Sequence, residues 1–184
     1  EITLDGEKIG WRNIGRIAFA TSEPSFFPAM DAEGHKACYQ EHFGTFKEKR
    51  FDALMEFFEL PANRAIGKFS TGQKNQFEVL LALSQGADYI LMDEPFAGND
   101  IFNREDFYKV LLGLLEPSET VILIEEVENF VGRAVLLHKG KVIGDLNVEE
   151  IRESGRTLVE LIKESYRYRA GRVGQAIAKM EEES

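Results

Sequence analysis

One place in the sequence joins a strongly apolar run directly to acidic side chains. Residues 89–92, TyrIleLeuMet, are followed at once by Asp93, Glu94 and Pro95. Such a run is typical of a buried strand in a parallel sheet, and ligands bind these sheets at the carboxyl ends of the strands. There Asp93 is positioned to hold Mg²⁺ through water and Glu94 to direct an attacking water. The alternative is a pair of acids that only cap the next helix.

A second segment of interest lies about twenty residues earlier. PheSerThrGlyGln at 69–73 precedes a stretch with helical periodicity. A Ser hydroxyl, a Gly that allows close approach of the backbone, and the free N–H groups of a helix start together form an anion site. A third segment, PheAlaGlyAsnAsp at 96–100, follows Pro95.

The elements that must position these groups alternate between strands and helices. Short β-branched or aromatic runs predict strands at 2–4, 14–20, 89–92 and 120–124. Apolar stripes with helical spacing predict helices at 47–60, 74–84 and 103–115, with Gly86 ending the second. This alternation predicts an α/β fold with a mostly parallel sheet and flanking helices.

The remaining segments predict smaller elements. A short helix is expected through Val127 and Phe130, then a hairpin of 134–137 and 142–145 with Gly140 in its turn. A further helix starts at Asn147, which has capping-box spacing to Glu150. We expect three parts: an α/β core of 1–30 and 87–150, a helical subdomain of 31–86, and a helical extension of 151–184.

Composition narrows the possible classes of protein. The 184 residues include 22 basic and 32 acidic ones, a net charge of −10, so we expect no nucleic-acid partner. The single Cys38 cannot form an internal disulfide, which favours a reduced, intracellular protein. His35, His42 and His138 share no motif spacing, and structural or solvated roles are expected for them.

The order and spacing of the three segments resemble the nucleotide-binding subunit of an ABC transporter. PheSerThrGlyGln resembles the signature motif of that family, TyrIleLeuMetAspGluPro its Walker B strand, and AlaGlyAsnAsp its D-loop. The resemblance implies a P-loop NTPase-like fold of ABC type, with ATP and Mg²⁺ as cofactors and ATP hydrolysis as the activity.

The resemblance also implies roles for individual residues. Asp93 would hold Mg²⁺ through water, and Glu94 would be the general base. The residues expected to bind the nucleotide are Phe69, Ser70, Thr71, Gly72 and Gln73 of the signature, Ser22 of the switch loop, and Asn99 and Asp100 of the D-loop. Ser70, Gly72 and Gln73 would grip the γ-phosphate of ATP held by a second subunit.

Two partners follow from the same resemblance. One is a second nucleotide-binding subunit, in a homodimer or heterodimer, and the other is a transmembrane subunit contacted near residues 22–42. The implied location is the cytoplasmic face of the cell membrane. Phe26 and Phe27 are either core residues or part of the pocket for that transmembrane subunit.

The sequence departs from the family pattern at three points. It contains no GxxxxGK[ST] phosphate loop, so we expect that loop to precede residue 1 and the chain as given to be inactive alone. Ser22 stands where the family usually has Gln and is too short to reach Mg²⁺ in the same way. Ile124 runs straight into Glu125, without the histidine turn of the family, and we expect the chain to be discontinuous there.

Two other functions remain open at this point. One is a soluble ABC-type ATPase that works without a transporter. The other is a non-catalytic regulatory protein that keeps the fold, which the missing phosphate loop and histidine would fit.

Overall fold

The computed structural model describes residues 2–21, 25–93, 95, 104–124, 131–138, 140–158 and 160–162. The chain divides into two compact units, Glu1–Glu125 and Glu126–Ser184. The three-part division expected from the sequence, with boundaries at 30, 86 and 150, stays a prediction.

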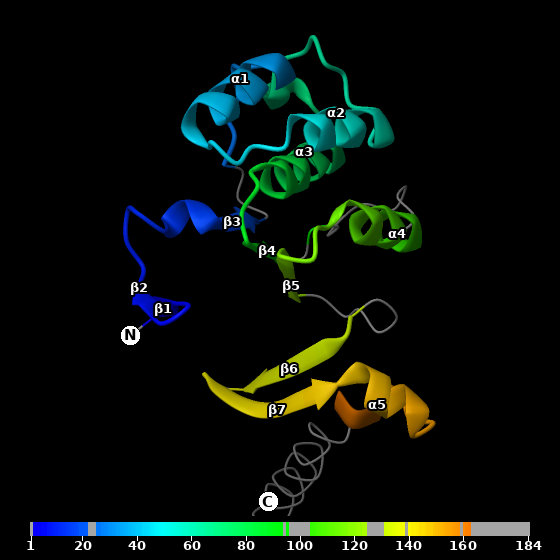
Figure 1. Ribbon diagram of the computed structural model, residues 1–184. Coiled ribbons are helices and arrows are strands. Elements are labelled where there is room, and N and C mark those ends of the chain that lie inside the picture. Colours follow the sequence, from blue (N-terminus) through cyan, green and yellow to red (C-terminus); the bar gives the residue numbers. More distant parts are fainter. Residues whose placement is uncertain are drawn as a thin grey trace, which may run out of the picture. The chain divides into compact units, whose positions relative to one another are not determined.

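The centre of the first unit is a parallel sheet of three strands (Figure 1). Its order is β3 (Ile17–Ala20), β4 (Tyr89–Asp93) and β5 (Thr120–Ile124). Ala20 pairs with Met92, and Asp93 pairs with Ile124, so the three carboxyl ends meet at one edge. The α/β fold class with a parallel sheet is therefore confirmed.

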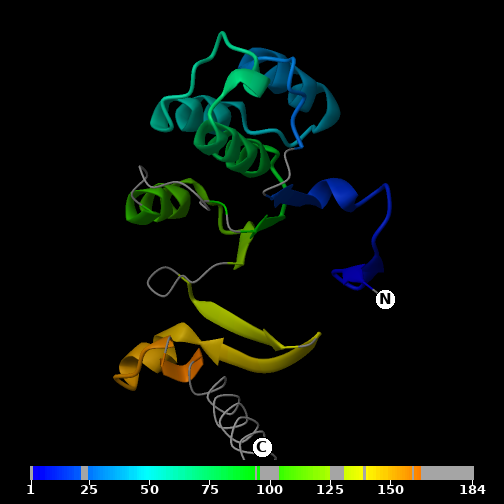
Figure 2. The ribbon, with the colours of Figure 1, turned by 180° about the vertical axis from the view of Figure 1, so that it is seen from behind.

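Four α-helices accompany this sheet: α1 (Ala32–His42), α2 (Glu48–Phe57), α3 (Thr71–Ser84) and α4 (Arg104–Leu114). Helix α3 lies between the sheet and the other two helices of the region 31–86, as both views show (Figures 1 and 2). Every residue from Phe77 to Ser84 is buried for this reason, which exceeds the single apolar stripe expected from the sequence.

The two faces of the sheet differ in burial. Ala18, Ala20, Ile90 and Met92 are at most 1% exposed, whereas Phe19 on the opposite face is 52% exposed. The alternation is that of strands whose successive side chains point to opposite faces. The described residues thus cover one face fully and the other only in part.

The strand expected over 14–20 is partly wrong. Ile14–Arg16 forms a 3₁₀ helix, and the strand begins at Ile17. The Asn13 side chain accepts a hydrogen bond from the Gly10 N–H at 2.8 Å, and the Ile14 N–H donates to the Gly10 carbonyl. This local turn overrides the β preference of the isoleucines. The strand expected at 2–4 is β1 (Thr3–Leu4), paired with β2 (Glu7–Lys8).

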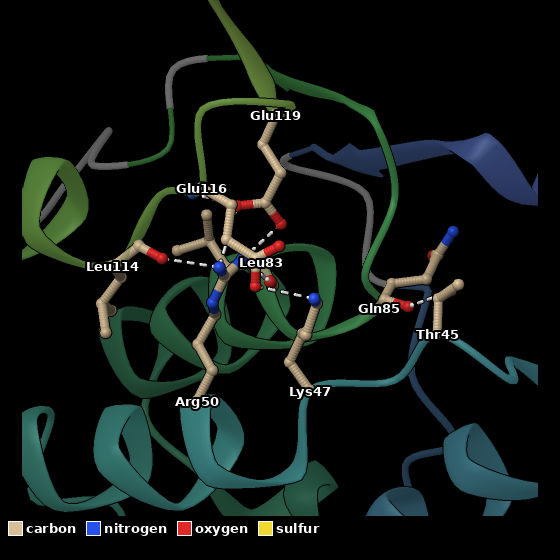
Figure 3. A network of polar contacts seen from close by, with 8 residues as sticks. All are labelled: Thr45, Lys47, Arg50, Leu83, Gln85, Leu114, Glu116 and Glu119. Atoms are coloured by element: carbon tan, nitrogen blue, oxygen red, sulfur yellow. Dashed lines mark hydrogen bonds and ion pairs between the residues drawn. The ribbon is translucent and has the colours of Figure 1, made fainter.

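A buried ion pair ties α2 to the chain entering β5 (Figure 3). The Arg50 guanidinium donates two hydrogen bonds of 2.8 Å to the Glu119 carboxylate, and both side chains are at most 6% exposed. Arg50 also donates to the carbonyls of Leu83, at the end of α3, and Leu114, at the end of α4. One side chain therefore joins the ends of three helices.

Gly86 allows the chain to leave α3. Its φ of +77° is in the left-handed region, and a Cβ there would lie 1.9 Å from the Thr45 carbonyl oxygen. Only glycine meets both conditions, so the predicted helix end at this residue is confirmed.

The second unit contains the predicted hairpin. Strands β6 (Arg133–His138) and β7 (Lys141–Asn147) pair antiparallel, with Gly140 at φ +71° in the turn. Helix α5 (Val148–Glu153) follows, and the Asn147 side chain accepts from the Glu149 N–H. The hydrophobic core of this second unit contains Val148, Ile151 and Leu158. The predicted helix through Val127 and Phe130 and the tail from residue 163 lie outside the described residues.

Candidate functional site

The predicted anion site at residues 69–73 is a capped helix start. The Ser70 hydroxyl accepts a hydrogen bond from the Gln73 N–H at 3.2 Å, and the Gln73 side-chain oxygen accepts from the Ser70 N–H at 3.1 Å. This reciprocal capping box fixes the first turn of α3. Ser70 and Thr71 are exposed, and Gly72 and Gln73 are half-buried, so this turn is open to a ligand.

Phe69 occupies a different environment from the four residues that follow it. Its side chain is 4% exposed and packs edge to face against Phe77, with ring centroids 6.1 Å apart. Its N–H donates to the Ile66 carbonyl. Because the ring points into the core, Phe69 anchors the start of α3, and a side-chain contact with a phosphate is not available to it.

Asp93 is the last residue of β4, the middle strand of the sheet. Its side chain is exposed, and its backbone pairs with Ile124 at the end of β5. An exposed carboxylate at the carboxyl end of a central parallel strand is a suitable oxygen ligand for Mg²⁺. Asp93 and the Ser70–Gln73 turn lie on separate elements, the sheet edge and the start of α3.

Four other predicted site residues lie outside the described residues: Ser22, Glu94, Asn99 and Asp100. Glu125, at the expected discontinuity, does so as well. Within the described ranges no group of three or more His, Cys, Asp or Glu side chains forms a metal site. Mg²⁺ bound together with a nucleotide needs only one or two carboxylates, because phosphate oxygens and waters complete its shell.

Sequence reasoning missed a buried carboxylate on α3. Glu78 is 3% exposed and accepts two hydrogen bonds from Ser25, from the N–H at 3.0 Å and from the hydroxyl at 2.5 Å. Burial raises the pKa of Glu78, and the two hydrogen bonds from Ser25 oppose that rise. The only available signal was a glutamate between Phe77 and Val79, inside the apolar second half of this helix.

His35 on α1 contacts the segment between β3 and α1, to which Ser25 and Phe27 belong. Its Nδ1 lies 2.7 Å from the Asp31 carbonyl, which can only accept, so Nδ1 carries the proton. Nε2 is then free to accept from the Phe27 N–H at 2.9 Å. The imidazole is fully buried, and this burial lowers its pKa. The structural role expected for His35 is thereby confirmed.

Several proteins of known name are similar to this chain in sequence. The chain is 29% identical over 148 residues to a Saccharolobus solfataricus protein named as an ABC transporter ATP-binding protein, covering 75% of this chain and 28% of that one. It is 27% identical over 173 residues to the SkfA peptide export ATP-binding protein SkfE of Bacillus subtilis, covering 89% and 72%. The chain therefore spans only about a quarter of the archaeal relative. No protein-family model matches it.

A solved structure described as the ATP-binding subunit of an ABC transporter shares the fold. The TM-score is 0.71 at 21% sequence identity, over 82% of this chain and 68% of that one. The fold is that of ABC-type ATP-binding subunits, within the P-loop NTPase-like class. The chain is similar in sequence and in fold to ATP-binding proteins of ABC transporters, which is the resemblance that the three sequence motifs indicated.

Proposed function

We propose that this protein is the ATP-binding and ATP-hydrolysing subunit of an ABC transporter. The observation that carries the proposal is the exposed, capped start of α3 at Ser70–Gln73, with Asp93 following at the carboxyl end of the central strand. The names of the relatives support the same function. Because the chain spans part of the archaeal relative's length, the proposal concerns the full-length protein.

The first turn of α3 has the groups needed to bind a phosphate. The Ser70 oxygen accepts from the Gln73 N–H, which leaves its own O–H free to donate to a ligand. The Gln73 oxygen accepts from the Ser70 N–H, which leaves its NH₂ group as a second donor. The free N–H groups of the helix start and the positive end of its dipole add to these donors. We assign Ser70, Gly72 and Gln73 to the γ-phosphate of ATP bound by a second subunit.

The sheet edge supplies the remaining groups in this proposal. Asp93 would hold, through water, the Mg²⁺ that accompanies ATP, and this ion would neutralise charge on the phosphates. Glu94 accepts the proton of the attacking water as general base. Ser22, Asn99 and Asp100 take the roles of the switch loop and the D-loop. Phe69 supports the signature turn by packing its ring against Phe77 and does not contact the phosphate through its side chain.

Two partners belong to the proposal. A second nucleotide-binding subunit completes each site, and a transmembrane subunit receives the motion at the cytoplasmic face of the cell membrane. In the part of the chain that the structure describes, no helix has the length and apolar character needed to cross a bilayer.

The replacement Glu94→Gln in the full-length protein tests the proposal. We expect ATP hydrolysis to fall by about 10²–10⁴-fold while ATP binding persists, because the amide cannot accept the proton of water. Phosphate release and binding of a fluorescent ATP analogue measure the two effects. Glu56→Gln, at an exposed position of α2, is the control and should hydrolyse ATP as the wild type does. A Glu94→Gln protein with wild-type turnover would remove Glu94 from the mechanism.

Two further measurements separate the proposal from the alternatives. Co-purification with a transmembrane subunit is expected for a transporter component and not for a soluble ATPase. ATP binding by the full-length wild type is expected for both ATPases and not for a regulatory protein that has lost nucleotide binding.

A further inference from the structure

The connection between β3 and α1 touches α3 and the chain that leads into α3. At its start, Ser25 donates two hydrogen bonds to Glu78, in the second turn after the capped start. Further along, the Pro28 carbonyl accepts from the Gly67 N–H at 2.8 Å, and the Met30 carbonyl accepts from the Ile66 N–H at 2.9 Å. Only Lys68 separates residues 66 and 67 from Phe69 and Ser70. The connection 25–31 therefore braces the start of α3 from two sides.

The second contact of this brace needs a glycine. A Cβ on Gly67 would lie 2.7 Å from the Pro28 carbonyl oxygen and 3.1 Å from the Pro28 Cβ. Real Cβ atoms do not approach a backbone oxygen so closely, so the hydrogen bond from Gly67 depends on the absence of a side chain. An alanine here must push the 66–67 segment away from the connection.

A buried carboxylate stabilises the fold less than an apolar side chain of similar volume would at the same position. Removing the charge of Glu78 from water has a large cost, and an apolar side chain of similar volume would fit the buried α3 without it. The carboxylate does fix the position of Ser25, since one of its oxygens accepts from the Ser25 N–H and the other from the Ser25 hydroxyl. His35 adds a third fixed point through the Phe27 N–H.

We propose that Glu78 is a positioning residue that, through Ser25 and the 25–31 connection, fixes the position of the Ser70–Gln73 turn. The described part of the connection contacts Glu78 on α3 and the 66–67 segment that comes shortly before the turn. The functional part of this inference rests on the proposed ATPase function. The geometric part concerns the described residues alone.

Hydrogen exchange of the full-length protein without nucleotide tests the geometric part. In Glu78→Leu we expect the amide of Ser25 to exchange about tenfold faster, because it loses its acceptor. Exchange at Ile66 and Gly67 should also accelerate, because the brace loosens as a unit. Gly67→Ala should accelerate exchange at the same amides, because the added Cβ pushes the 66–67 segment away from Pro28. Unchanged protection of Ile66 and Gly67 in Glu78→Leu would overturn the inference.

Kinetics test the functional part and separate positioning from folding. We expect Glu78→Leu to keep or raise the unfolding stability, to bind ADP as the wild type does, and to lower kcat about ten- to a hundredfold through misplacement of the signature turn. Glu78→Gln should recover most of kcat, because its amide oxygen still accepts from the Ser25 N–H and its NH₂ can donate to the hydroxyl.

Val79→Ala is the matched control, since Val79 is the buried neighbour of Glu78 on α3. It should lower stability and leave kcat within about twofold of the wild type. A wild-type kcat in Glu78→Leu, or an equal loss in Val79→Ala, overturns the positioning role. Failure of the wild type to bind ATP would instead overturn the proposed function, and the exchange experiment would still decide whether Glu78 braces α3.

Discussion

Two buried titratable side chains, Glu78 and His35, hold the 25–31 connection. Their contributions to the unfolding free energy change with pH in opposite directions. The pKa of Glu78 is raised by burial, so its contribution to stability is fully present below its unfolded pKa of about 4.5 and is lost as the pH rises through the folded value. The pKa of His35 is lowered by burial, so its contribution is present above about 6.5 and is lost as the pH falls through the folded value. Neutral forms of both side chains favour the fold.

Because the pKa of His35 is lowered, we expect the unfolding free energy to fall on the acid side of about pH 6.5, and we call this decrease the acid limb. Below about pH 6.5 the unfolded state takes up a proton that the folded imidazole refuses, so the unfolding free energy of the wild type should fall. Protonation of Nε2 would also remove the acceptor of the Phe27 N–H. His35→Gln should be less stable near pH 8 and should lack this limb, as measured by urea unfolding between roughly pH 5 and 8.

His42 on the same helix is the control for this prediction. Its side chain is exposed and its Nδ1 lies 2.8 Å from the Cys38 carbonyl. His42→Gln should keep the acid limb of the wild type. A His35→Gln protein with the same slope as the wild type would mean that another group produces the limb.

At the scale of the secondary-structure elements, one buried polar contact joins α2 to the ends of α3 and α4 and to the chain entering β5. Arg50 is enclosed by the Glu119 carboxylate and two carbonyls at helix ends (Figure 3). Burial alone would raise the pKa of Glu119, but hydrogen bonds from Arg50 and from the Glu116 N–H bring it below the ordinary value. The contribution of Glu119 is therefore present above about pH 4.5 and is lost as the pH falls further.

Arg50→Met should lower the unfolding free energy by about 3–5 kcal/mol, because it leaves the Glu119 carboxylate buried and unpaired. The double variant Arg50→Met/Glu119→Leu should recover a large part of this loss. Urea unfolding near neutral pH measures both effects.

The nearby pair of Lys47 and Glu116 is a matched exposed control. Its atoms lie 2.7 Å apart, and the side chains are 35% and 50% exposed. Lys47→Met should cost at most about 1 kcal/mol, since water screens this pair. If Arg50→Met cost no more than Lys47→Met, burial of the ion pair would not be the source of its importance.

At the scale of the whole molecule, the proposed function requires two subunits to close on ATP. Ser70→Arg in the full-length protein should prevent ATP-dependent dimerisation, because a long cationic side chain fills the space that the γ-phosphate needs. Each monomer should still bind nucleotide. Sedimentation velocity with a non-hydrolysable ATP analogue measures this effect.

The N-cap role of Ser70 requires a control for helix stability. Loss of the cap alone costs about 1 kcal/mol. Ser70→Thr keeps a hydroxyl that caps the helix and should still dimerise. ATP-dependent dimers of Ser70→Arg would contradict the role of Ser70 at the subunit interface.

The sequence alone was sufficient for the features that depend on near neighbours. The strand at 89–92, the helix over 74–84 and the hairpin turn at Gly140 follow from periodicity and turn preferences, which act over a few residues. The order of the three motifs was likewise enough to indicate the similarity to ABC transporter ATP-binding proteins that the comparisons found. The predicted start of β3 was wrong because Asn13 and Gly10 form a turn that the pattern of β-branched residues does not reveal.

Only the tertiary structure showed which residues far apart in the sequence are in contact. Ser25 and Glu78 are 53 positions apart, and Arg50 and Glu119 are 69 apart. No local preference brings such residues together, because their contacts exist only after α3 has packed between the sheet and the other helices. The same packing buries all sides of α3 from Phe77 to Ser84, and it brings Glu78, which looks ordinary in the sequence, into contact with Ser25.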